Sequence, residues 1–138
     1  MTCLPSVIAL CATLTGSPSV VDGDTLRFTT HTVRLHGIDA EERHEPNGPR
    51  ATQALRQIVA GTAYVRCVPD GNYTHNRVVA SCYTAKGEDI GALMVTRGYA
   101  LDCARYSKGR YRPLEPQGVR LRLLAKAYCA PFPARLTR

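Results

Sequence analysis

The feature that most constrains the fold is a series of short β-strand patterns interrupted by one longer helix pattern. Runs of β-branched and apolar residues predict strands at 13–22, 25–29, 32–37, 63–68 and 77–83. The helix pattern follows the third strand, with apolar residues recurring at spacings of three and four. Pro49 suits its first turn and Gly61 is placed to end it. Turn-rich stretches at 39–49 and 69–76 are predicted to be loops.

Two more helices are predicted after the strands. One begins at Glu88 and Asp89, whose negative charges favour a helix N-terminus, and the other lies within residues 115–128. Five strands with a helix after the third is the order of an OB barrel. The sequence therefore predicts an α+β fold, a five-stranded OB-fold β-barrel with about three helices, as a single domain over residues 13–138. Residues 1–12 are interpreted as an N-terminal extension or the remnant of a leader.

Positive charge is concentrated in the last third of the chain. Residues 1–96 carry 8 basic and 9 acidic side chains and residues 97–138 carry 10 and 2, which together make the totals of 18 and 11. A basic surface of this kind suits a phosphate-bearing partner, although an excess that serves only solubility has the same composition. Apolar stretches fall short of the roughly 20 residues of a membrane-spanning helix, so no membrane association is predicted.

The cysteine pattern favours disulfides over a metal site. The six cysteines contain no C-x-x-C pair and no zinc-finger spacing. An even number of cysteines without metal spacing indicates disulfides and an oxidising compartment. The alternative is a set of buried free thiols in a cytosolic protein.

Five acidic residues are clustered within a span of 21 residues. They are Asp22, Asp24, Asp39, Glu41 and Glu42. A hairpin between the first two and the last three can bring Asp24 and Asp39 together, and two neighbouring carboxylates repel each other unless a cation or proton lies between them. Oxygen ligands without His or Cys suit calcium or magnesium. The alternative is that these are ordinary polar turn residues.

Two arginines occupy apolar strand settings. Arg34 lies between Val33 and Leu35, and Arg77 precedes an apolar run. An arginine in such a setting is either paired with a carboxylate or directed at a ligand, and its planar fork suits phosphate oxygens. Acids, strand arginines and a basic C-terminal third together suggest phosphodiester chemistry.

Three motifs resemble the staphylococcal nuclease family. They are VVDGDTL at 20–26, VRLHGIDAEE at 33–42 and NRVVA at 76–80, and the later segments GYAL at 98–101 and RYSKG at 105–109 resemble its secreted bacterial members. The resemblance covers residues 13–128. It implies a monomeric, secreted or periplasmic, calcium-dependent endonuclease that hydrolyses DNA and RNA on an OB barrel.

The resemblance also implies roles for single residues. Asp24, Asp39 and the Ala40 carbonyl match the family's calcium ligands, and Asp22 matches an acidic residue that shapes the site. Glu42 matches the glutamate that orients or deprotonates water, and Arg34 and Arg77 match the two arginines that grip the phosphate. The candidate substrate contacts are His75, Tyr106, which matches a tyrosine lining the nucleotide site, and Lys108.

The chain departs from the family pattern at two loops. Glu41 replaces the usual proline and is expected to face outward beside Glu42. Asn76 replaces a glycine, and because asparagine tolerates left-handed backbone, the turn can survive.

Secreted relatives often pair cysteines at the places of Cys67 and Cys82. Cys103 and Cys129 are then expected to pair by elimination and to pin the basic tail to the barrel, which leaves Cys3 and Cys11 to pair with each other or stay free.

The rival interpretation is a non-catalytic nucleic-acid-binding OB domain, because OB folds commonly bind single strands. The acidic set argues against it, since a pure binder has no reason to place Asp24, Asp39 and Glu42 against phosphates. A barrel that only docks onto another protein is supported by fold analogy alone.

Overall fold

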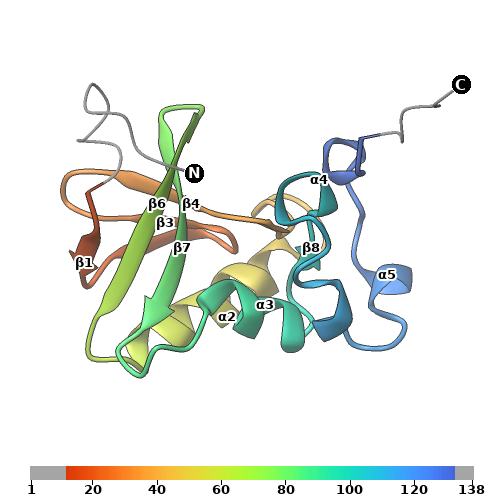
Figure 1. Ribbon diagram of the computed structural model, residues 1–138. Helices are drawn as coiled ribbons and strands as arrows, with labels where there is room; N and C mark the ends of the chain where they lie inside the picture. The colour runs from red at the N-terminus through yellow and green to blue at the C-terminus, as the bar shows by residue number, and fades with distance from the viewer. Residues whose placement is uncertain (1–11, 133–138) are drawn as a thin grey trace, which may run out of the picture.

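A curled six-stranded sheet forms the N-terminal half of the molecule (Figure 1). The computed structural model describes residues 12–132, so Cys3 and Cys11 lie outside the described residues. The strands are β1 (Leu14–Gly16), β2 (Ser19–Asp22), β3 (Thr25–Arg27), β4 (Thr32–Leu35), β6 (Val65–Thr74) and β7 (Arg77–Thr84). Their order in the sheet is β1-β6-β7-β4-β3-β2. The β4–β7 pair is parallel and the other pairs are antiparallel.

Alternating burial explains why the long hairpin of β6 and β7 forms. Along β7 every second residue, from Val78 to Thr84, is buried, as expected for a strand with one face on the core. Cys67 and Cys82 face each other in the register and form a disulfide. The predicted loop at 69–76 is wrong for most of its length: β6 continues to Thr74, with an irregularity between Pro69 and Tyr73 that absorbs the turn-forming residues.

Two helices lie against the sheet, as Figure 1 shows. Helix α2 (Gly48–Ala60) buries Ala51, Leu55 and Ile58 in the core and is followed by Gly61, as predicted. Helix α3 (Ile90–Thr96) begins after Asp89, whose side chain caps it by accepting a hydrogen bond from the Ala92 backbone N–H at 3.1 Å.

Two glycines allow close packing around the β2–β3 turn and the start of α2. A Cβ on Gly23 would lie 2.6 Å from the Cβ of Ala51 and 2.7 Å from the Cβ of Ala40. A Cβ on Gly48 would lie 1.7 Å from the Glu42 carbonyl oxygen. Both distances are below van der Waals contact, so the acidic turn and the 41–48 loop require glycine at these two positions.

Gly48→Ala is therefore expected to destabilise the protein by about 1–3 kcal/mol, the usual cost of forcing extra volume into a packed site. Thermal melting followed by circular dichroism measures it. The control is Gly16→Ala, where the added methyl would meet Phe28 at an ordinary 3.8 Å. Equal melting temperatures for the two variants would contradict this account of the loop.

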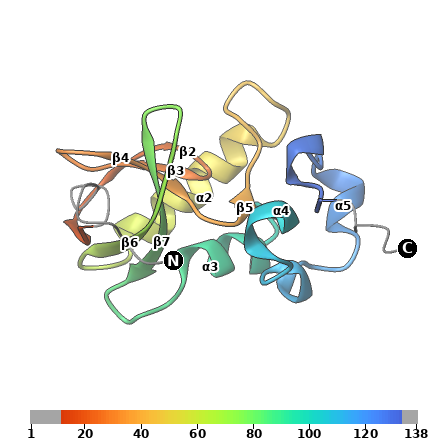
Figure 2. The same ribbon diagram turned by 45° about the horizontal axis from the view of Figure 1, so that its top comes forward.

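A second, smaller sheet joins the barrel to the C-terminal part. Strand β5 (Ile38–Asp39) pairs with β8 (Leu101–Asp102). Figure 2 shows β5 beside α4, on the side of the sheet that faces the C-terminal segment. Short elements follow: α4 (Ala104–Ser107), η2 (Arg112–Leu114), α5 (Val119–Arg122) and η3 (Ala127–Cys129).

The predicted helix within residues 115–128 is wrong. Only α5 and the single turn η3 are helical there. Gly118 has a φ of +77°, and Pro116 precedes it, so a helix cannot start earlier. Leu121, which a helix over this range would turn toward the core together with Leu124 and Tyr128, is 95% exposed. Val119 and Leu123 instead pack on Leu101.

The α+β class and the OB-type curled sheet agree with the prediction, but the strand count differs. The predicted strand at 13–22 is divided into β1 and β2, and β5 and β8 are additional. In the part of the chain that the structure describes, no helix has the length and apolar character needed to cross a membrane.

Candidate metal and phosphate site

Asp24 and Asp39 meet at one arginine. Nη2 of Arg34 lies 3.3 Å from Asp24 Oδ2 and 3.4 Å from Asp39 Oδ1. Both aspartates are 6% exposed. The residues come from the β2–β3 turn, β4 and β5, so the hairpin brings the two carboxylates together across 15 positions of sequence.

Local hydrogen bonds hold Asp24 in this position. Its Oδ2 accepts from the Ala40 backbone N–H at 3.0 Å, and its Oδ1 accepts from the Thr25 hydroxyl at 3.0 Å. The Asp24 N–H donates to Asp22 Oδ1 at 3.2 Å, which closes the tight turn. Asp22 therefore supports the shape of the turn.

Arg34 is fixed by both ends of its guanidinium. Nη1 donates to the carbonyls of Leu35 at 2.8 Å and Ile38 at 2.9 Å, while Nη2 faces the two aspartates. Burial alone would lower the pKa of Arg34, but the carboxylates of Asp24 and Asp39 raise it above its usual value. The guanidinium is thus a permanent positive charge at the centre of the site.

Burial and mutual repulsion disfavour the ionised acids. Burial raises the pKa of Asp39 to about 6, and the Asp24 charge acts in the same direction, while a hydrogen bond from Tyr128 and the charge of Arg34 oppose the rise. Burial and the Asp24 charge likewise raise the pKa of Asp22 to about 6. One arginine does not balance this acidic group, which is therefore suited to a cation.

The second arginine joins the site through a threonine. Nη1 of Arg77 lies 3.3 Å from the Thr25 hydroxyl, which also contacts Asp24. Arg77 follows a turn in which His75 and Asn76 have φ values of 47° and 63°. Asn76 thus adopts the left-handed conformation of the glycine that it replaces.

The structure places Glu41 opposite to the expectation that it faces outward. Its side chain faces inward and is 4% exposed. Its Oε2 accepts from Asn47 Nδ2 at 2.7 Å and from the Leu124 N–H at 3.4 Å, and its Oε1 accepts from the Asn47 N–H at 3.2 Å. The side chain of Glu42 is 66% exposed and lies 3.5 Å from His44 Nδ1.

The remaining candidate substrate residues lie in the β6–β7 turn and at α4. Tyr106 is 55% exposed, and Lys108 ends α4 with a left-handed backbone and donates to the Arg105 carbonyl at 3.4 Å. Within residues 12–132, no hydrogen bond or ion pair joins His75, Tyr106 or Lys108 to Asp24, Arg34 or Asp39.

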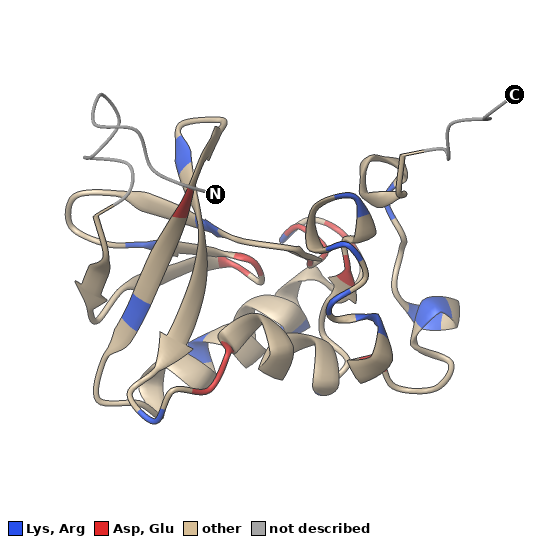
Figure 3. Ribbon diagram, viewed as in Figure 1, with Lys and Arg blue, Asp and Glu red and all other residues tan. Residues whose placement is uncertain are grey.

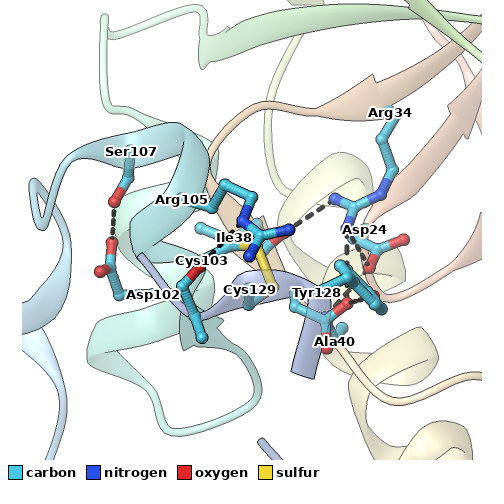
Figure 4. The surroundings of a disulfide bond; sticks show 12 residues. Asp24, Arg34, Ile38, Ala40, Asp102, Cys103, Arg105, Ser107, Tyr128 and Cys129 are labelled. Carbon is cyan, nitrogen blue, oxygen red and sulfur yellow. Dashed lines mark hydrogen bonds and ion pairs between the residues drawn. A yellow bond between two sulfur atoms is a disulfide. The ribbon is translucent and has the colours of Figure 1, made fainter. Parts of the chain in front are cut away.

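The C-terminal strap, defined as residues 123–132, contributes groups that sequence reasoning missed. The Tyr128 hydroxyl donates to Asp39 Oδ1, and Lys126 Nζ forms an ion pair with Glu45. The Cys103–Cys129 disulfide ties the strap to the start of α4. Figure 4 shows Tyr128 beside Asp24 and Arg34, and Cys129 in the disulfide with Cys103. The one sequence signal for this contact was the expected pairing of Cys129, the neighbour of Tyr128.

The donor set fits a hard divalent cation. Among the described residues, no group of three or more His, Cys, Asp or Glu side chains is placed so that all of them could hold a metal ion. Protein ligands would therefore be the carboxylates of Asp24 and Asp39 and the Ala40 carbonyl, with water completing the shell, as magnesium and calcium commonly allow.

Comparisons with known proteins relate the chain to one family. The family model described as staphylococcal nuclease homologue matches residues 32–120, which include Arg34, Asp39 and Arg77. A succinoglycan biosynthesis protein, ExoI, from Rhizobium meliloti (strain 1021) is 28% identical over 106 residues, covering 70% of this chain and 56% of that protein. The chain thus spans little more than half the length of that relative. Since the family model matches more than half of the chain, the protein belongs to the staphylococcal nuclease homologue family.

Proposed function

We propose that this protein is a calcium-dependent endonuclease that hydrolyses phosphodiester bonds of DNA and RNA. The observation that carries the proposal is the buried pair Asp24 and Asp39 around the Arg34 guanidinium. A bound cation stabilises a carboxylate pair of this kind by offsetting the repulsion between its charges, and a bound anion pairs favourably with the arginine beside it. A metal-bound phosphate group supplies both.

Asp24, Asp39 and the Ala40 carbonyl would hold calcium. When bound, the ion would act as a Lewis acid toward a phosphate oxygen and offset the charge that develops in the transition state. Asp22 supports this set from the turn through its hydrogen bond with the Asp24 N–H.

The two arginines would bind the phosphate, and Glu42 would act as the general base. Arg34 and Arg77 bind the phosphate oxygens, and because their guanidinium groups are held by backbone carbonyls and Thr25, they need little reorganisation during the reaction. Glu42 accepts the proton of the attacking water, and its exposed carboxylate is accessible to solvent. His75, Tyr106 and Lys108 contact the nucleic acid further from the reacting phosphate.

The charge distribution supports a nucleic-acid substrate. Figure 3 shows basic segments along the C-terminal elements, which include Arg105, Lys108, Arg110 and Arg122. Such a surface attracts the phosphodiester backbone of a nucleic acid and orients it toward the acidic site. The two disulfides are typical of an oxidising compartment, which supports a secreted or periplasmic location. We propose that the protein acts there as a monomer.

A cleavage assay tests the proposal. Supercoiled plasmid and single-stranded RNA are incubated with the protein in calcium, in magnesium and in excess chelator, and products are followed on gels. Cleavage in calcium that chelator stops is expected. Full activity in chelator would contradict the proposal, and retarded but intact nucleic acid in calcium would favour the non-catalytic binding domain.

A further inference from the structure

The C-terminal strap is anchored on both sides of Tyr128. Besides the Cys103–Cys129 disulfide, the Arg105 Nε–H donates to the Ala130 carbonyl at 2.9 Å, and the Arg105 guanidinium lies 4.4 Å from the ring centroid of Phe132. At the other end, the Leu124 N–H reaches Glu41 and Lys126 reaches Glu45. Tyr128 is thus held between two anchored ends.

The strap closes over a cavity that Asp39 also lines. This cavity has a volume of about 210 Å³, and Lys126, Cys129 and Pro131 line it from the strap side. The Tyr128 hydroxyl reaches Asp39 from the strap, across 89 positions of sequence. Tyr128 is 48% exposed, so its ring gains little from burial and its hydroxyl makes the specific contact.

The Tyr128 contact uses Oδ1 of Asp39, so the Oδ2 oxygen is available to other partners. Both Tyr128 and Arg34 approach Oδ1. A hydroxyl that donates to one oxygen of a ligating carboxylate fixes its orientation, and groups of this kind commonly tune metal affinity. Arg34 alone cannot orient the Asp39 carboxylate for a metal ion. Its Nη2 is shared with Asp24, and its positive charge repels a cation.

We propose that Tyr128 is a positioning residue that orients the Asp39 carboxylate for calcium, and that the Cys103–Cys129 disulfide holds it there. The inference rests on the proposed function, because it requires Asp39 to bind the ion. The strap would thus affect calcium affinity through Asp39, without supplying a ligand to the metal itself.

Calcium titration by isothermal calorimetry tests the role of the hydroxyl. Tyr128→Phe removes it and keeps the ring, and the calcium Kd is expected to rise by about tenfold or more. Tyr64→Phe, which removes the hydroxyl of another exposed tyrosine, is the matched control and keeps the wild-type Kd. Melting temperatures in chelator are measured in parallel, and Tyr128→Phe is expected to stay within a few degrees of wild type.

A second variant pair tests the role of the disulfide. Cys103→Ser with Cys129→Ser releases the strap, and the calcium Kd is expected to rise as far as it does in Tyr128→Phe. Adding Tyr128→Phe to this background should change the Kd no further, because two changes that act through one contact are not additive. Two independent effects that multiply would overturn the link between the disulfide and Tyr128.

The outcomes separate the two proposals. A wild-type protein that binds no calcium refutes the proposed metal site and this inference with it. Wild-type calcium binding with an unchanged Kd in Tyr128→Phe refutes only the inference. Tighter binding in Tyr128→Phe also refutes it, since the hydroxyl would then compete with the ion for Asp39.

Discussion

Asp39→Asn is expected to abolish calcium binding and to lower the cleavage rate by roughly 10³-fold or more, because a bound metal ion supplies several kcal/mol of transition-state stabilisation. Asparagine keeps the shape of the side chain, and its amide oxygen can still accept from the Tyr128 hydroxyl. The fold should therefore survive, while the charge that faces Arg34 and the cation is lost.

The measurement is the initial rate of plasmid cleavage in saturating calcium, together with calcium calorimetry and a thermal melt. Glu88→Gln is the matched control: it makes the same carboxylate-to-amide change at a residue whose side chain contacts Thr84 rather than the acidic site. Substantial activity in Asp39→Asn with wild-type calcium affinity would show that the ion binds elsewhere.

The half of the site carried by the β2–β5 segment could be predicted because its geometry is local. A tight Asp-Gly-Asp turn and a short hairpin leave few ways to place Asp24 relative to Asp39, and the alternation of β4 directs Arg34 toward both. Gly23 is required by close packing on Ala40 and Ala51, which only the folded chain reveals.

The C-terminal half could not be predicted because its order depends on distant contacts. Residues 115–128 contain apolar residues at helical spacing, but the segment is held by Arg120 on Glu115 and by the strap's contacts with Glu41, Glu45 and Asp39. Such contacts override a local pattern. For the same reason Glu41 was expected outside, since its partners Asn47 and Leu124 lie 6 and 83 positions away.

The two neighbouring glutamates should separate catalysis from stability. Glu42→Gln is expected to lower the cleavage rate by about 10²-fold or more, because an amide cannot accept the proton of the attacking water. Its side chain is mostly exposed, so the melting temperature should hardly change. A rate measured under single-turnover conditions distinguishes the chemical step from substrate binding.

Glu41→Gln should show the reverse result. Both Glu41 oxygens accept hydrogen bonds from Asn47, and Oε2 also accepts from Leu124, so an amide nitrogen at either position must face a donor. Loss of a buried, charged hydrogen bond costs about 1–3 kcal/mol of folding stability, which should appear as a lower melting temperature. At temperatures where the variant is folded, it should keep most of the wild-type cleavage rate. If Glu41→Gln lost the larger share of the rate and Glu42→Gln lost little, the base would be the inward-facing glutamate. The loop from Asp39 to Gly48 would then have to open during the reaction, since Glu41 is 4% exposed in the present structure.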